Sequence, residues 1–585
     1  MLRHWVVLLG MSLVLSSCNT ETPEAELPAF VPEPKPQQIA HQVKIAAPND
    51  LAADIGLGVL QQGGHAMDAA IAVKAVLGLV EAPETGWGGG GFVLYYDAAS
   101  KQTRFYDGRE TAPLAAQPDR FTLLGRAVPW YTAMPTGRSV GVPGMPALMS
   151  DLHSKYGRLA WADLLAPAID LAEQGVPMPI RLAAQIEADP SLRLFPDTRD
   201  YFRTQAQQEP ARLVNQAYAD TLRRLAESGG RAFYEPPLST AVIERASQGR
   251  FWPSDLAQAD FDQYQMIERD AVCANYRQWR VCGAPPPSSG GITLLQTLGM
   301  LESQDLAALG PDSDLAWHWI LEASRLAFAD RHRFLGDPDQ VSVPVAELID
   351  PQYLSLRAEL IRTDRAMTEV PFGDPQSLRA SAGYSQPLEG VREGTSHLSL
   401  VDADGNVVLF TSSIEKPFGN RMMTEGFLLN NQLTDFTFNA SAEFGAHPNA
   451  VAGGKRPRSS MAPILVFDES GELVLALGSR GGSRIIGYVL KTLIAHLDWQ
   501  MPLEQAVALP NVLYSGQAIE VEANSGAVRR VAGLEALGHS VTVTNLTSGV
   551  HGLAREGEGW QGAADPRMTG VSRGFNVQRA EEDGQ

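Results

Sequence analysis

The chain has 585 residues, of which 44% are hydrophobic, and its 47 Lys and Arg against 67 Asp and Glu give a net charge of −20. A chain of this length and composition can bury a large core, which predicts a globular protein. The negative charge would repel a phosphate backbone, so the composition argues against a nucleic-acid-binding protein.

The N-terminus has the composition of a secretory signal. A short basic segment precedes an apolar run that ends at Leu15 and is too short for a stable transmembrane helix. The tetrad LSSC resembles the bacterial lipobox, whose cysteine, here Cys18, is lipidated; a lone free cysteine is the alternative. We expect a signal peptide at 1–17 and a disordered, Pro- and Glu-rich tether at 18–40. Since Asn19 follows the cysteine, we expect a periplasmic lipoprotein at the outer membrane, in membrane contact only through this anchor.

Two helices and a glycine-rich segment come next. Residues 50–64 and 66–80 are predicted helices, and the second is apolar around its whole circumference, as a buried helix is. The run GWGGGGF at 86–92 leads into a strand. A phosphate-binding loop is the alternative, but no Gly-Lys-Ser/Thr and no helix follow it, so the run predicts tight backbone packing. Residues 148–265 are mostly helical and charged, which predicts a surface layer.

Two cysteines remain after the tether. Cys273 and Cys282 lie in AVCANYRQWRVCG, where two β-prone runs flank a turn at 275–278. They can form a disulfide across a hairpin in an oxidising compartment. No further cysteine or clustered histidine accompanies them, so no metal site is predicted.

The rest of the chain alternates helices and strands. Helices are predicted at 292–302 and 318–337, strands at 463–468 and 472–478, and a further helix at 483–499. The composition and these elements alone predict a large secreted α/β protein.

A hairpin is predicted in HLSLVDADGNVVLFTSS. With Asp404-Gly405 as a two-residue loop, the pairing places Thr395 near Ile414. A register changed by one residue would instead put Ser413 directly opposite Thr395.

Ten segments carry a resemblance to a known family. They are GGHAMDAAIA, GWGGGGF, GRETAP, GVPGMPA, PPPSSGG, EASRLAFADR with LGDPD, GTSHLSLVD, LLNNQLTDF, KRPRSSM and GSRGGSRI. In this order they resemble the conserved blocks of the γ-glutamyltranspeptidases, over nearly the whole chain after the tether. The resemblance implies an α/β (α+β) fold, a four-layer αββα sandwich of the N-terminal-nucleophile hydrolase type.

The same resemblance implies self-cleavage between Gly394 and Thr395. The product would be a heterodimer of a large chain, 41–394, and a small chain, 395–585. The Thr395 hydroxyl attacks the preceding carbonyl, and the α-amine released by cleavage then serves as its general base, without a cofactor. Ser413 stands where the family has a threonine that hydrogen-bonds the nucleophile.

The family match also assigns the oxyanion hole and the substrate pocket. Gly481 and Gly482 match the backbone oxyanion hole, although a Gly-Gly pair alone indicates a surface turn. Arg109 matches the arginine that holds the donor's α-carboxylate, where the alternative is a surface ion pair. The remaining matches are Ser459 and Ser460 for that carboxylate, and Gln432 and Asp435 for the α-ammonium. Glu415 departs from the asparagine of better-known members, although a carboxylate can also bind an ammonium.

The implied activity is γ-glutamyl transfer or hydrolysis on glutathione and other γ-glutamyl amides, with water, amino acids or peptides as acceptors. One alternative is an acylase for glutaryl or cephalosporin amides, whose acyl group lacks the α-ammonium. A second is a non-catalytic lipoprotein scaffold, against which the presence of Thr395, Arg109, Gly481 and Gly482 argues.

Overall fold

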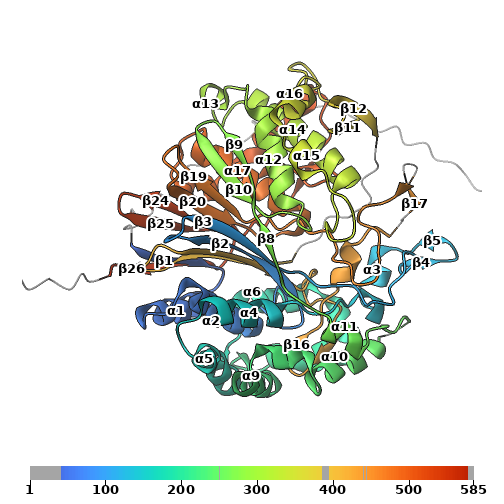
Figure 1. Ribbon diagram of the computed structural model, residues 1–585, viewed down its shortest axis with the longest axis vertical. Coiled ribbons are helices and arrows are strands. Elements are labelled where there is room, and N and C mark those ends of the chain that lie inside the picture. Colours follow the sequence, from blue (N-terminus) through green and yellow to red (C-terminus); the bar gives the residue numbers. More distant parts are fainter. Residues whose placement is uncertain (1–40, 250, 385–393, 439–440, 443–444, 578–585) are drawn as a thin grey trace, which may run out of the picture.

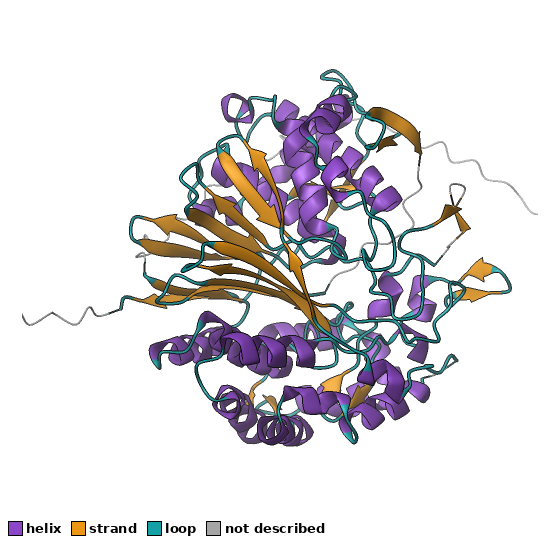
Figure 2. Ribbon diagram, viewed as in Figure 1, coloured by secondary structure: helices purple, strands orange, loops and turns teal. Residues whose placement is uncertain are grey.

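The computed structural model describes residues 41–249, 251–384, 394–438, 441–442 and 445–577. The predicted signal peptide, Cys18 and the tether lie outside these residues. Two β-sheets lie face to face between two layers of helices (Figures 1 and 2). This arrangement confirms the predicted αββα fold. Among the described residues, no helix combines the length and apolar character that a membrane crossing requires.

The first sheet has seven strands and holds the predicted nucleophile. In their order of pairing, its strands are β26 (Val571–Phe575), β1 (Val43–Ala47), β13 (Ser396–Val401), β14 (Val407–Ser413), β2 (Gly90–Asp97), β3 (Gln102–Gly108) and β8 (Ile267–Asp270). Every residue of the central strands β13 and β14 is buried, because helices cover one face of the sheet and the second sheet covers the other.

The second sheet has six strands. In their order of pairing, they are β25 (Gly559–Ala564), β24 (His551–Glu556), β20 (Leu473–Gly478), β19 (Ile464–Phe467), β10 (Trp279–Gly283) and β9 (Val272–Tyr276). Cys273 and Cys282 are directly opposite each other on β9 and β10 and form a disulfide.

The two helical layers are formed by different parts of the chain. The layer on the seven-stranded sheet contains α1 (Asp50–Gln61), α2 (Ala66–Val80), α4 (Met145–Tyr156), α5 (Trp161–Gln174), α9 (Gln216–Ser228) and α10 (Leu238–Ser247). The layer on the six-stranded sheet contains α12 (Gly290–Leu301), α14 (Asp314–Phe334), α16 (Pro351–Ala358) and α17 (Ile485–Leu497). All fifteen residues of α2 are buried, as its apolar sequence predicts. The imidazole of His65 caps α2 by accepting from the Met67 N–H.

The β13–β14 hairpin corrects the predicted register by one residue. Ser396 pairs with Ser412, and Asp402 donates its N–H to the Asn406 carbonyl. The loop therefore has three residues and ends in Gly405 with φ of 85°, a conformation that favours glycine. The two-residue loop was wrong because the Asp402 carboxylate accepts from the Asn406 N–H and stabilises the wider turn. With this register, the position opposite Thr395 is Ser413.

The glycine run before β2 packs tightly, as predicted. A Cβ atom on Gly89 would lie 2.2 Å from the Ser413 carbonyl oxygen, and one on Gly88 would lie 2.1 Å from the Leu428 carbonyl oxygen. Only glycine fits at these two positions, and the run brings the start of β2 against the end of β14.

Candidate active site

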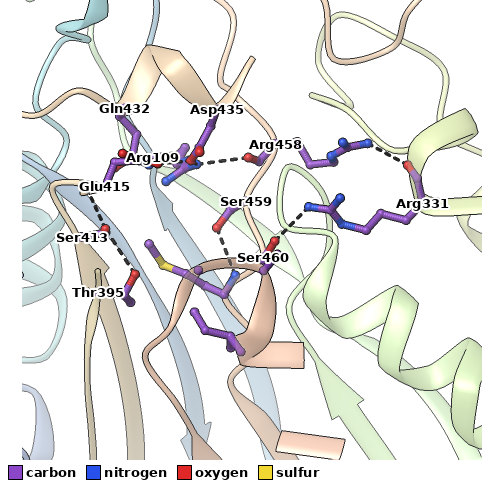
Figure 3. Close-up of a pocket in the computed structure, with 14 residues that line it drawn as sticks. Arg109, Arg331, Thr395, Ser413, Glu415, Gln432, Asp435, Arg458, Ser459 and Ser460 are labelled. Carbon is purple, nitrogen blue, oxygen red and sulfur yellow. Dashed lines mark hydrogen bonds and ion pairs between the residues drawn. The ribbon is translucent and has the colours of Figure 1, made fainter. Parts of the chain in front are cut away.

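One pocket lies at the open end of the β13–β14 hairpin, where β13 begins and β14 ends (Figure 3). Its lining contains eight of the predicted site residues: Thr395, Ser413, Glu415, Gln432, Asp435, Arg109, Ser459 and Ser460. Gly482 lines it as well. Gly481 and Gly394 are hydrogen-bonded to each other, and each is next in sequence to a residue of the lining, Gly482 and Thr395 respectively.

Thr395 immediately precedes β13 and is 4% exposed. Its Oγ1 donates a hydrogen bond to Ser413 Oγ over 3.3 Å (Figure 3). Ser413 Oγ also accepts from the Glu415 N–H at 2.8 Å, which fixes the serine rotamer. The corrected hairpin register is what brings the two hydroxyls together.

The backbone at Thr395 is strained, and the residue before it must be a glycine. Thr395 has φ of 84°, which is unfavourable for a β-branched residue, and Gly394 has φ of 155°. A Cβ on Gly394 would lie 1.7 Å from the Glu415 carbonyl oxygen, so only glycine fits before the threonine. The peptide bond predicted to be cut therefore joins a position that only glycine can occupy to a threonine in a conformation that costs energy.

The Gly481-Gly482 pair faces this bond from the second sheet. It follows β20 and precedes α17, with φ of 126° at Gly481 and 62° at Gly482. The Gly481 N–H donates to the Gly394 carbonyl oxygen at 3.1 Å. A backbone donor is thus aimed at the carbonyl that the Thr395 hydroxyl would attack.

Arg109 and Asp435 form an ion pair at the other end of the pocket. Arg109 follows β3, is 1% exposed, and its Nη2 donates to Asp435 Oδ2 at 2.6 Å. Gln432 Nε2 donates to the same oxygen at 2.6 Å. The Arg109 guanidinium also donates to the Pro457 carbonyl at 3.1 Å, which fixes its plane. A cation and an anion therefore lie side by side above Thr395 (Figure 3).

Glu110 lies behind Arg109 and is completely buried. Burial raises the pKa of its carboxyl to about 8, although the Arg109 Nη1, 3.8 Å away, opposes the shift. At neutral pH this side chain is therefore mainly uncharged. The acidic side chains that line the pocket are Glu415 and Asp435.

Glu415 follows Ser413 with φ of 79° and is 6% exposed. Its Oε2 accepts from the Asn431 amide. The side chain lies between Thr395 and the Arg109–Asp435 pair, so a molecule that contacts both ends of the pocket would also contact Glu415 (Figure 3).

Ser459 and Ser460 form the opposite wall. Ser459 Oγ accepts from the Met461 N–H at 3.1 Å, and its own N–H donates to the Pro287 carbonyl at 2.9 Å. Ser460 Oγ accepts from Arg331 Nη2 at 2.9 Å. The wall is thus held by the segment before α12 and by α14.

The sequence did not single out five other residues of the lining, namely Arg331, Arg458, Met461, Ser483 and Ile485. All five lie within three blocks that were singled out, EASRLAFADR, KRPRSSM and GSRGGSRI, so these blocks were the available signal. Arg331 lies on a helix and reaches the pocket only through tertiary packing.

The chain is similar to known proteins over nearly its whole length. The family model described as Gamma-glutamyltranspeptidase matches residues 52–575. The chain belongs to the γ-glutamyltranspeptidase family. The glutathione hydrolase proenzyme of Bacillus subtilis (strain 168) is 32% identical over 99% of this chain and 100% of its own length. As a γ-glutamyltranspeptidase family member with such relatives, the protein is an enzyme with a hydrolase or transferase role.

Acylases are among the relatives of this family member as well. The acylase ACY 1 proenzyme of Pseudomonas sp. (strain V22) is 32% identical over 86% of this chain and 88% of its own length. The crystal structure of the cephalosporin acylase from Bacillus halodurans shares the fold, with a TM-score of 0.80 and 24% identity over 94% of this chain and 100% of that one.

Proposed function

We propose that the enzyme cuts itself between Gly394 and Thr395 and then transfers or hydrolyses γ-glutamyl groups through an ester on Thr395. The observation that carries this proposal is the pocket itself. At one end Thr395 lies beside the Gly394 carbonyl, which accepts from the Gly481 N–H, and at the other end Arg109 and Asp435 form a cation–anion pair.

Self-cleavage would begin with attack of the Thr395 hydroxyl on the Gly394 carbonyl carbon, which closes a five-membered ring. The oxyanion forms on the Gly394 oxygen, to which the Gly481 N–H already donates. The carbon–nitrogen bond then breaks, the nitrogen takes a proton, and an ester remains. Water opens the ester, leaving a Gly394 carboxylate and a free Thr395 amine. Relief of the backbone strain at Thr395 favours the forward direction.

Turnover would reuse the same groups. The freed α-amine removes the hydroxyl proton as Thr395 attacks the γ-carbonyl of the donor, and the proton passes to the departing amine. The glutamyl ester is then attacked by water or by the amine of an acceptor amino acid or peptide. Ser413 would keep the hydroxyl oriented in both steps through its 3.3 Å contact.

The polar end of the pocket supports an amino-acid head group. Arg109 would bind the α-carboxylate together with Ser459 and Ser460, and Asp435 would bind the α-ammonium with Gln432. In the described residues the Arg109 and Asp435 side chains satisfy each other at 2.6 Å. A zwitterion can replace this pair without leaving either charge unpaired, because it offers one group of each sign.

Glutaryl amides are the competing donor class, and one relative is named as an acylase. A glutaryl group offers a carboxylate to Arg109 but no ammonium, so it would leave two carboxylates, Asp435 and Glu415, facing an uncharged chain. The charge of the pocket therefore favours the γ-glutamyl donor.

Two measurements test the proposal. Mass spectrometry of the denatured protein should give two chains, one of which begins at Thr395, whereas Thr395→Ala should stay uncut. Ser396→Ala is the matched control, since it removes the adjacent hydroxyl and should cut normally. Activity on γ-glutamyl anilides should exceed activity on glutaryl anilides. A single chain in the wild type, or a preference for glutaryl, would contradict the proposal.

We also propose that 41–394 and 395–585 stay together as a heterodimer, and that the tether at 18–40, which continues into the large chain, anchors it to the outer membrane through Cys18. The lipobox-like tetrad and Asn19 support the anchor. Metabolic labelling with a radioactive fatty acid should mark the wild type and leave Cys18→Ser unlabelled. Label in both proteins would refute lipidation at this cysteine.

A further inference from the structure

Arg480 precedes the two oxyanion-hole glycines and reaches back to the nucleophile. Its side chain is 4% exposed. Its Nε donates to the Thr395 carbonyl oxygen at 3.2 Å, and its Nη2 donates to Glu84 Oε1 at 2.9 Å. A guanidinium presents its donors in a fixed plane, so these two bonds set its position relative to Thr395.

Glu84 is anchored on its other side by helix α6 (Ile180–Ala188). Its Oε1 also accepts from Arg181 Nη2 and from Gln185 Nε2, each at 2.6 Å. Burial works against ionisation of this fully enclosed carboxyl, but the charges of Arg480 and Arg181 outweigh it and hold the pKa of Glu84 below its ordinary value. Arg480 therefore faces a carboxylate fixed to the helical layer.

The backbone of Glu84 contacts the strand that carries Ser413. Its carbonyl accepts the Ile414 N–H at 3.3 Å, one residue beyond the serine. Glu84 thus contacts Ile414, the residue after Ser413, through its main chain and Arg480 through its side chain.

The contacts of Arg480 and Gly481 form a matched pair. The Gly481 N–H holds the Gly394 carbonyl at 3.1 Å, and the Arg480 guanidinium holds the carbonyl of the next residue, Thr395, at 3.2 Å. The carbonyls of the two residues that the predicted cleavage bond joins therefore accept hydrogen bonds from two consecutive residues of the loop after β20. Without the guanidinium, the strained Thr395 would be free to relax away from the oxyanion donor.

We infer that Arg480, oriented by Glu84, is a positioning residue that holds Thr395 in register with the oxyanion hole during self-cleavage and acyl transfer. The inference rests on the proposed function. Arg480 contacts the carbonyl of Thr395 and none of the residues assigned to the amino-acid head group, so its loss should slow chemistry and leave donor binding intact. A displacement of the nucleophile of about 1 Å is enough to lower a rate by about 100-fold.

The test compares Arg480→Met, Arg480→Lys and Glu84→Gln with the wild type. We measure the half-time of conversion to two chains, and then kcat and KM for a γ-glutamyl anilide on the processed protein. We expect Arg480→Met to process and turn over about 100-fold more slowly, with KM within twofold of the wild type. Arg480→Lys, which keeps the charge, and Glu84→Gln, which keeps the shape, should show smaller losses in kcat. If Arg480→Met stays uncut and cannot be assayed, kcat and KM are measured on Arg480→Lys and Glu84→Gln instead.

Arg484→Met is the matched control. Arg484 is four residues further on, is also buried, and donates to both oxygens of Glu520 at 2.6 and 2.9 Å. Its loss should lower the thermal midpoint as Arg480→Met does, with normal processing and normal kcat.

Three outcomes would overturn the inference: wild-type rates in Arg480→Met, a loss confined to KM, or an equal loss of rate in Arg484→Met. A wild type that does not cut itself, or does not act on the γ-glutamyl anilide, would instead refute the proposed function. The two failures are therefore distinguishable.

Discussion

Replacing Asp435 with asparagine removes the negative charge beside Arg109 and keeps the shape of the side chain. In the described structure the carboxylate accepts from Arg109 and from Gln432, each at 2.6 Å. If the pocket binds a zwitterion, the substitution costs the contact with its ammonium. If it binds a carboxylate alone, the substitution frees Arg109 from a competing anion.

The size of the effect follows from the contact. A hydrogen bond to a charged group contributes about 1.5 to 3 kcal/mol, which corresponds to about a 10- to 150-fold change in an equilibrium constant. The Asp435 side chain is 19% exposed, so water screens it little. We expect kcat/KM for a γ-glutamyl anilide to fall by this factor, mostly through KM, because the ammonium is bound equally in the ground and transition states.

The assay compares γ-glutamyl and glutaryl anilides on the same protein. For the glutaryl donor we expect an unchanged or higher kcat/KM. Asp339→Asn is the control, since Asp339 also pairs with an arginine, Arg269, at 2.6 Å but lies outside the pocket. Equal losses on both donors in Asp435→Asn would refute the assignment of Asp435 to the ammonium.

Three further predictions concern neighbouring residues. Ser413→Ala removes the acceptor of the Thr395 hydroxyl, so the rate of self-cleavage and kcat should each fall about 10-fold or more, as a gel time course and steady-state kinetics would show; unchanged rates would exclude this role. Gly394→Ala places a methyl 1.7 Å from the Glu415 carbonyl, so the precursor should be less stable and stay uncut, and normal processing would refute the close packing. The pKa of about 8 for buried Glu110 means that the folded state keeps a proton that the unfolded state loses above about pH 4.5. Stability should therefore fall by about 1.4 kcal/mol per pH unit between these values. Glu110→Gln should remove that dependence, so the difference between the thermal midpoints of the variant and the wild type should grow from pH 5 to pH 8; a constant difference would contradict it.

Much of the fold could be predicted from the sequence because its elements have strong local patterns. The apolar run of α2 and the alternating residues of β13 and β14 each determine an element without reference to the rest of the chain. The hairpin register could not be predicted, because the Asp402 side chain selects a three-residue loop over a two-residue one.

The pocket could be anticipated only through the family resemblance. Arg109 and Asp435 are 326 positions apart, and no local pattern indicates that they meet. The same is true of Arg331, which reaches Ser460 from α14, and of the bond between Arg480 and Thr395. Each of these contacts depends on how the layers pack, which a single sequence does not encode in any local spacing.

The strand order has a consequence for the life of the processed protein. In the seven-stranded sheet, β1 lies between β26 and β13, and β14 pairs with β2. Strands from before residue 394 therefore pair with strands from after it. In the other sheet, β19 pairs with β10 in the same way. A cut before Thr395 would therefore leave two polypeptides whose strands are hydrogen-bonded to each other in four pairs: β26–β1, β1–β13, β14–β2 and β19–β10. Such subunits would not exchange with others or dilute apart, and they would separate only when the whole molecule unfolds.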